Sequence, residues 1–147
     1  MKPVPIRVFL AEDNVADVWL IEEALKRQSL AFEIDHYTTA DEAIKAARNS
    51  GSEGNPVPDL ILLDYNLPRG HGCDILAAAA TNPNLSSVPK AILSSFLQPR
   101  ELQQALDLGA RGFITKPANL DDFLRDVGTK VIALLNEDVA SAARSEA

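Results

Sequence analysis

Short runs rich in apolar residues recur along the chain, and segments with helical spacing separate them. The runs lie at residues 6–11, 32–37, 60–64, 91–95 and 112–115. The helical segments lie at residues 15–28, 41–49, 74–81, 100–108 and 120–135. Short apolar runs bounded by polar turns predict strands, and apolar positions three or four apart predict helices. Their regular alternation predicts one α/β domain.

Two of the predicted strands, residues 6–11 and 60–64, are almost entirely apolar. Such strands are typical of a parallel sheet that helices cover on both faces. We therefore expect a doubly wound α/β fold, formed by residues 1–136. The remaining segment, residues 137–147, is polar and rich in alanine, and we expect it to fray.

Composition and charge narrow the classes of function. The 147 residues suit one compact domain, with 46% hydrophobic and 24% charged residues, as in an ordinary globular protein. The formal net charge of −7 argues against a nucleic-acid surface, which is expected to be basic. Cys73 is the single cysteine, the N-terminus lacks the apolar core of a signal peptide, and no apolar run has the length of a membrane helix. These features predict a cytoplasmic protein without direct contact to membrane or nucleic acid.

Polar residues that could take part in catalysis or metal binding lie at the ends of four of the predicted strands. Ligands of open parallel sheets collect at the carboxyl ends of the strands, so these side chains are expected to converge. Carboxylates brought together repel one another unless a cation joins them, and Mg²⁺ prefers such hard oxygen ligands. The residues are Glu12 and Asp13 after the first strand, Asp64 closing the third, Ser94 closing the fourth and Lys116 after the fifth.

The charges and positions suggest a role for each of these groups. Asp64 is predicted to attack phosphorus as a carboxylate nucleophile. Mg²⁺ and the Lys116 ammonium would neutralise charge on the transferring oxygens, and the Ser94 hydroxyl would hydrogen-bond the acyl phosphate. Taken singly, each residue is more typical of a helix cap or a solvated strand end. Their occurrence together, each at a strand end, favours the functional interpretation.

These residues, together with the motifs around them, resemble the receiver domain of two-component response regulators. The resemblance covers about residues 6–132 and extends more narrowly to the small stand-alone receivers that serve bacterial phytochromes. The motifs that carry it are Glu12-Asp13-Asn14, the run Leu-Leu-Asp64-Tyr-Asn66-Leu-Pro68 with Gly72, Ser94 after an aliphatic strand, and Lys116-Pro117.

The resemblance implies a flavodoxin-like, five-stranded parallel sheet in the order 2-1-3-4-5, flanked by five helices. A histidine kinase, in this subgroup a bacteriophytochrome, or a phosphotransfer domain would phosphorylate Asp64. Mg²⁺ would be held by Asp13, Asp64 and the main-chain carbonyl of Asn66, with Glu12 acting through water. The Lys116–Pro117 peptide bond would be cis.

Phosphorylation, by the same resemblance, would draw Ser94 toward the phosphoryl group and let Phe113 move inward. The domain would catalyse its own phosphorylation and hydrolysis without an independent substrate. Receivers also often form homodimers through the fourth helix, fifth strand and fifth helix. Residues 131–135 (VIALL) are apolar all round, which suggests a partner for that face. A short amphipathic tail packing on the same face is the alternative.

Trp19 is predicted to lie on the polar side of the first helix. Tryptophan is enriched at binding hot spots, and the resemblance implies that the first helix docks kinase or phosphotransfer domains, so we expect this side chain to belong to the kinase-facing surface. In the alternative interpretation, Trp19 folds back over Val15 or the neighbouring loop.

Two other functions are compatible with part of the pattern. A phosphatase of the haloacid dehalogenase type also uses an aspartate nucleophile with Mg²⁺, but it usually carries a second acid two residues later, where this chain has Asn66. A pseudo-receiver would share the fold and bind partners without accepting a phosphoryl group. The joint presence of the acidic residues, Ser94 and Lys116 disfavours it.

Overall fold

Five parallel strands form the main sheet of the computed structural model, which describes the backbone of residues 4–146 and the side chains of residues 4–136. The order across the sheet is β2-β1-β3-β6-β7. Counted along the chain, this is the predicted order 2-1-3-4-5, and the flavodoxin-like fold is confirmed. The strands are β1 (Ile6–Ala11), β2 (Phe32–Tyr37), β3 (Leu60–Asp64), β6 (Lys90–Ser94) and β7 (Gly112–Thr115).

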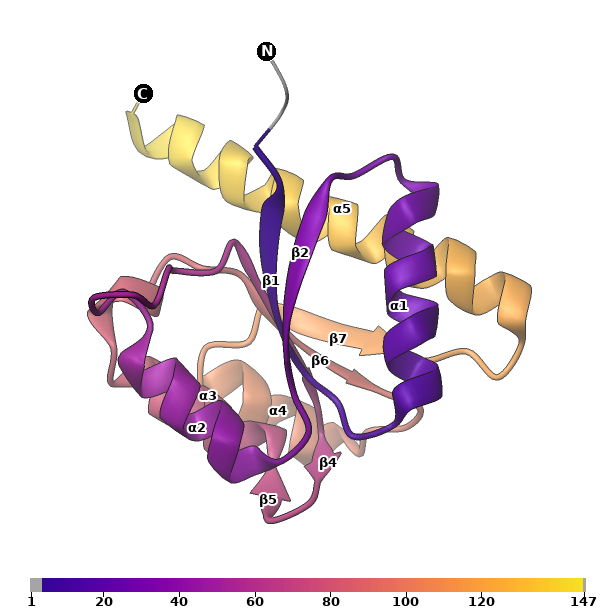
Figure 1. The fold of residues 1–147 in the computed structure, drawn as a ribbon, viewed down its shortest axis with the longest axis horizontal. Helices are drawn as coiled ribbons and strands as arrows, with labels where there is room; N and C mark the ends of the chain where they lie inside the picture. The colour runs from indigo at the N-terminus through magenta and orange to yellow at the C-terminus, as the bar shows by residue number, and fades with distance from the viewer. Residues whose placement is uncertain (1–3, 147) are drawn as a thin grey trace.

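The helices cover both faces of this sheet (Figure 1). The first and last helices pack together on one face, and the other three lie on the opposite face. Among residues 4–146, no helix combines the length and the apolar content needed to cross a membrane. The helices are α1 (Val15–Arg27), α2 (Ala40–Asn49), α3 (Gly72–Ala80), α4 (Pro99–Asp107) and α5 (Leu120–Glu146), with a 3-10 turn at Pro83–Leu85.

Helix α5 is longer than the helix predicted over residues 120–135. The segment that follows is rich in alanine, the residue that most favours helix, so the predicted end was placed too early. The side chains of residues 137–147 lie outside the described residues, and the frayed tail stays a prediction.

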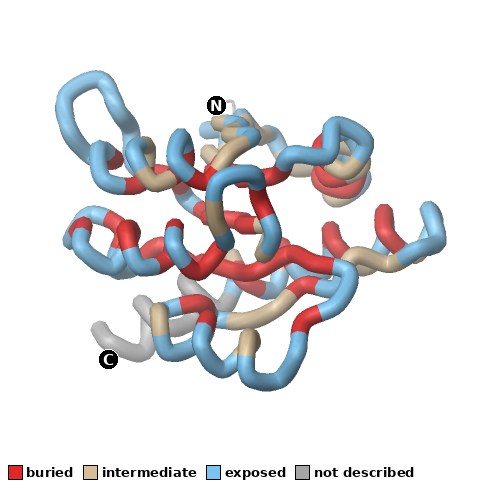
Figure 2. The backbone as a smooth tube through the Cα atoms, turned by 90° about the horizontal axis from the view of Figure 1, so that it is seen from below, coloured by how far each residue is buried: buried red, intermediate tan, exposed pale blue. Residues whose placement is uncertain are grey.

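The central strand β3 explains why an apolar run precedes Asp64. Ile61 and Leu63 pack against α2 and α3, whereas Leu60 and Leu62 pack against α1 and α5. All four side chains are fully buried, and burial of a leucine or isoleucine contributes about 1.5–3 kcal/mol. Figure 2 shows buried residues concentrated along the central strands and the inner helix faces. Asp64 is thus the last residue of a central strand that is buried on both faces, and it lies at the carboxyl end of that strand.

A small hairpin follows β3, and the sequence pattern did not predict it. Strands β4 (Asn66–Leu67) and β5 (Gly70–His71) pair antiparallel and are too short to show a periodicity. Arg69 lies at the turn with φ +67°, in the left-handed region. Gly72 begins α3 where a Cβ atom would approach the Asp64 carbonyl oxygen to 2.7 Å, so only glycine fits there.

Candidate functional site

The carboxyl edge of the sheet brings three of the predicted acidic side chains together. Glu12 and Asp13 follow β1, and Asp64 ends the neighbouring strand β3. One carboxylate oxygen from each of the three lies within 4.8 Å of the others. Glu12 is fully buried, Asp64 is partly buried and Asp13 is exposed, so the cluster opens to solvent on one side.

Lys116 lies opposite these carboxylates, as the sequence predicted, and its side chain is only 9% exposed. Its Nζ atom donates to Glu12 Oε2 at 2.6 Å, to Asp17 Oδ2 at 2.9 Å and to Asp64 Oδ2 at 3.4 Å. An ammonium group has three N–H donors. Each donor therefore has one carboxylate partner, and the contact with Asp64 is the longest.

For both Glu12 and Lys116, burial and the neighbouring opposite charge shift the pKa in opposite directions. Burial raises the pKa of Glu12 to about 7, although the hydrogen bond from Lys116 opposes this shift. Burial lowers the pKa of Lys116, but its hydrogen bonds to Glu12 and Asp17 outweigh this, and the pKa is raised overall. The ammonium therefore stays charged at neutral pH. With all groups ionised, the four carboxylates of Glu12, Asp13, Asp17 and Asp64 against one ammonium leave a formal charge of −3 (1 − 4).

This donor set fits a divalent cation. The three clustered groups supply hard carboxylate oxygens, and the exposed side at Asp13 leaves room for water or a phosphate oxygen. Mg²⁺ characteristically binds through one or two carboxylates and keeps several waters. A cation here would also reduce the repulsion between Glu12, Asp13 and Asp64.

Ser94 and Asn66 are less directly connected to the cluster. The Ser94 hydroxyl is buried and donates to the main-chain carbonyl of Phe96 at 3.0 Å, so it is held within its own loop. The Ser94 carbonyl accepts from the Lys116 backbone N–H at 2.9 Å, which links the ends of β6 and β7. Asn66 lies in β4 with an exposed side chain, immediately beyond the end of β3.

The cis peptide bond implied by the family resemblance is not observed. Every peptide bond among residues 4–146 is trans, including Lys116–Pro117. The trans isomer is the intrinsically preferred one even before proline, by about 0.5–1 kcal/mol. Lys116 reaches the acidic cluster with this isomer.

Two residues at the site were missed by the sequence reasoning. Asp17, in the first turn of α1, binds the Lys116 ammonium; three residues after the N-cap Asn14, it has the position of an ordinary first-turn acidic residue, and the sequence carries no further signal for this contact. His36, near the end of β2, donates from Nε2 to the Glu12 main-chain carbonyl at 2.6 Å. Only the pairing of β1 with β2 places His36 there.

Comparison with known proteins identifies relatives of this chain. The family model of the response regulator receiver domain matches residues 8–127. Response regulator Rcp1 of Synechocystis sp. is 32% identical over 124 residues, and the match covers 84% of each chain. The solved structure of the phosphorylated cyanobacterial phytochrome response regulator RcpA aligns with a TM-score of 0.80 at 34% identity, covering 90% of this chain and 95% of that one. The Mn²⁺-bound form of Rcp1 aligns with a TM-score of 0.77 at 31% identity, covering 88% and 95%.

Proposed function

This chain belongs to the response regulator receiver domain family of two-component signalling, and from that premise we propose that Asp64 accepts the phosphoryl group. The observation that carries the proposal is the convergence of Glu12, Asp13 and Lys116 on Asp64 at the end of a buried strand. Receivers interact with histidine kinases or phosphotransfer domains. RcpA is a phytochrome response regulator, and its similarity to this chain supports a bacterial phytochrome as the kinase.

In the proposed reaction, a carboxylate oxygen of Asp64 attacks the phosphorus of a phosphohistidine. A P–O bond forms, the P–N bond breaks, and the histidine ring leaves with the electron pair and takes up a proton. Lys116 donates to a phosphoryl oxygen and offsets its negative charge. A bound Mg²⁺, held by Asp13, Asp64 and the Asn66 carbonyl with Glu12 acting through water, would supply further charge neutralisation. The domain thereby promotes its own phosphorylation and hydrolysis without an independent substrate.

Ser94 and Phe113 would carry the signal away from Asp64. The Ser94 hydroxyl would leave the Phe96 carbonyl, its present acceptor, and donate to a phosphoryl oxygen. That exchange would draw the β6–α4 loop toward the site. Phe113, half-buried on the neighbouring strand β7, would then move inward. Lacking a hydroxyl, Phe113 depends on packing alone in either position.

Acetyl phosphate with Mg²⁺, followed by intact mass measurement, tests this function. We expect the mass of one phosphoryl group to be added to the wild-type protein. A pseudo-receiver would gain no mass, and a phosphatase would turn over added phosphomonoesters. The family match favours a phosphate-accepting receiver over both alternatives. Asn66 also argues against the phosphatase, because that class usually carries an acid at this position.

Asp13→Asn is expected to stabilise the metal-free protein and to remove its response to Mg²⁺. Asp13 has no side-chain hydrogen bond or ion pair within the described part of the chain, so its charge mainly repels Glu12 and Asp64. Relief of that repulsion should raise the free energy of unfolding by about 1 kcal/mol. Thermal unfolding with and without Mg²⁺ measures both effects, because a ligand that binds only the folded state raises Tm. A metal-free variant less stable than wild type would contradict this role.

The first helix offers a surface for the kinase. Trp19 is 55% exposed and Val15 is 76% exposed on α1, which supports a solvent-facing position for Trp19 over one folded against Val15 or the neighbouring loop. Trp19→Ala is expected to slow phosphotransfer from the histidine kinase about tenfold, because a tryptophan hot spot contributes more than 1 kcal/mol to binding. Phosphorylation by acetyl phosphate should be unchanged, because it needs no docking. Equal rates of phosphotransfer from the kinase to variant and wild type would rule out this surface.

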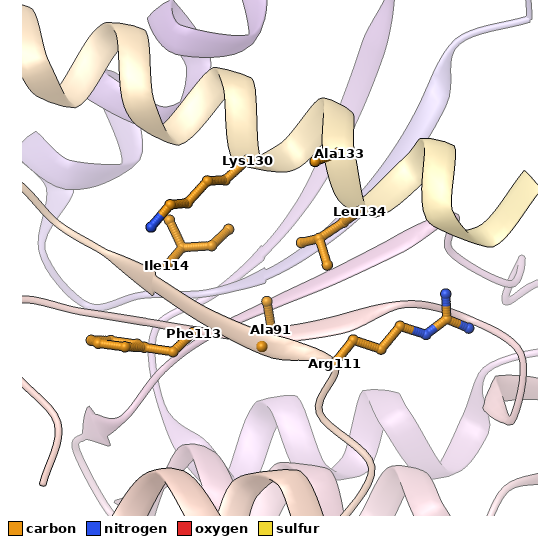
Figure 3. Close-up of a pocket in the computed structure, with 8 residues that line it drawn as sticks. Ala91, Arg111, Phe113, Ile114, Lys130, Ala133 and Leu134 are labelled. Atoms are coloured by element: carbon orange, nitrogen blue, oxygen red, sulfur yellow. The ribbon is translucent and has the colours of Figure 1, made fainter. Parts of the chain in front are cut away.

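A homodimer through α4, β7 and α5 is also part of the proposal. The apolar surplus expected at residues 131–135 is smaller than predicted, because Val131 and Leu134 are buried and Leu135 packs against the core. Other features support this face: β7 is an edge strand, and Leu106 of α4 is exposed. A pocket of about 160 Å³ lies between β7 and α5, and Figure 3 shows Lys130 and Leu134 reaching from α5 toward Ile114.

Sedimentation equilibrium is the measurement that checks the dimer. We expect dimers of the wild-type protein in the presence of an acyl-phosphate mimic. Leu106→Lys, which places a charge on the exposed side of α4, should shift the equilibrium toward monomer. A wild-type protein that stays monomeric at high concentration, with and without the mimic, would overturn the proposal.

We further place this receiver in the cytoplasm and assign it no direct nucleic-acid or membrane partner. Cys73 is a free, buried thiol, as expected in a reducing compartment. The formal charge of −7 disfavours contact with nucleic acid or with anionic lipid.

A further inference from the structure

Asp17 is the one carboxylate bound to Lys116 that the proposed phosphoryl transfer does not use. It lies in the first turn of α1, and its Oδ2 atom accepts from Lys116 Nζ at 2.9 Å. The contact of Lys116 with Asp64 is longer, at 3.4 Å. The ammonium is therefore closer to Glu12 and Asp17 than to the residue that would be phosphorylated.

A phosphoryl group on Asp64 would compete for this ammonium. Charge-assisted hydrogen bonds of an ammonium to phosphate are typically about 2.7–2.9 Å long, shorter than the present contact to Asp64. All three N–H donors of the ammonium are already shared among Glu12, Asp17 and Asp64. A donor turned toward a phosphoryl oxygen therefore draws the ammonium away from Glu12 or Asp17.

The burial of the two acceptors decides which of them releases the ammonium. Glu12 is fully buried, so loss of its bond at 2.6 Å would leave its carboxylate with the Asn14 backbone N–H as its remaining donor from the described part of the chain. The Asp17 side chain is 22% exposed, so water can replace the ammonium there. Asp17 is thus the partner whose bond is broken at the lower cost.

We propose that Asp17 is a positioning residue that holds the Lys116 ammonium back from Asp64 and releases it when the phosphoryl group arrives. The inference rests on the proposed function, because it assigns the phosphoryl group to Asp64. Asp17 then destabilises the phosphorylated state relative to the unphosphorylated state. Since Asp17 lies two residues before Trp19, its release also links the state of Asp64 to the first turn of α1.

Asp17→Asn tests the inference, with beryllium fluoride as the phosphoryl mimic. The amide keeps the shape of the side chain and removes its charge. At saturating Mg²⁺, we expect about tenfold tighter binding of beryllium fluoride, because a charged hydrogen bond that competes for Lys116 is weakened. Without beryllium fluoride, Mg²⁺ should bind several-fold more weakly, because one negative charge is lost and the ammonium moves toward the cation ligands. A purely structural role of Asp17 would weaken both ligands together.

Glu33→Gln is the matched control. Glu33 also forms an ion pair 2.9 Å long, with Arg7, near the amino ends of β1 and β2. Its loss removes the same charge, and we expect neither affinity to change. If Asp17→Asn binds beryllium fluoride no more tightly than Glu33→Gln, the inference is overturned. If the wild-type protein neither binds beryllium fluoride nor accepts phosphate, the proposed function falls and the inference with it.

A measurement on the wild-type protein removes any dependence on the folding of the variant. The ¹³C resonance of the Asp17 carboxyl group is followed in the Mg²⁺-saturated protein as beryllium fluoride is added. Exchange of ammonium for water should shift this resonance, whereas that of Glu33 should stay in place. An unchanged Asp17 resonance at full occupancy would show that the ion pair with Lys116 persists, and would overturn the inference.

Discussion

Asp64→Asn is expected to abolish phosphoryl incorporation from acetyl phosphate, by at least about a thousandfold. The amide that replaces the carboxylate is not a nucleophile, and no other carboxylate of the cluster has the same place at the end of β3. The substitution changes one atom at a partly buried position and leaves the four buried residues of the strand untouched. The variant is therefore expected to fold. Intact mass after incubation with acetyl phosphate and Mg²⁺ is the measurement.

Asp59→Asn provides the matched control. Asp59 directly precedes β3, at the opposite end of the strand, where its Oδ2 atom accepts from the Arg7 backbone N–H at 2.8 Å. This variant should gain the mass of one phosphoryl group, as the wild-type protein does. Phosphate found on Asp64→Asn in equal yield would mean that another residue is the acceptor.

Lys116→Met is expected to lower the free energy of unfolding by about 3 kcal/mol in the absence of metal. Methionine fills a similar volume but leaves Glu12, Asp17 and Asp64 without their shared cation. The largest part of the loss comes from Glu12, because its carboxylate is fully buried. Urea denaturation in the presence of a chelator measures the difference.

Two further variants test this electrostatic explanation. Glu12→Gln in the Lys116→Met background removes the buried charge and should restore most of the lost stability. Lys26→Met breaks an exposed ion pair with Glu23, 3.1 Å long, and should change stability by at most about 0.5 kcal/mol. A Lys116→Met protein as stable as wild type would show that the ammonium provides no net stabilisation to Glu12, Asp17 and Asp64.

Much of the site could be expected from the chain alone, because its residues stand at strand ends. In a parallel sheet, all strands end at one edge, so the positions of Glu12, Asp64 and Lys116 along the chain already imply their proximity. The fold was predictable for a related reason. The apolar run at Leu60–Asp64 suits only a strand covered on both faces, and the alternation with helical segments leaves few arrangements.

Other features depended on packing between distant segments. Asp17 contacts Lys116 only because the folded chain brings the first turn of α1 within reach of the Lys116 side chain, and no pattern in the sequence specifies that approach. The Ser94 hydroxyl was predicted as a ligand of the acyl phosphate, but the loop that follows β6 brings the Phe96 carbonyl within its reach. The apolar residues at 131–135 suggested a free face, yet most of them complete the core.

The order of the five main strands and five helices, the family, and the roles of Glu12, Asp13, Asp64 and Lys116 as the charged groups at the strand ends could be inferred from the chain alone. How the Lys116 ammonium is shared among Glu12, Asp17 and Asp64 becomes visible only in the folded protein. The two kinds of feature differ because the interactions that produce them differ in range. Apolar periodicity and turn residues act locally and are visible in the chain, whereas the strength of an ion pair depends on distances and burial that exist only after the chain has folded.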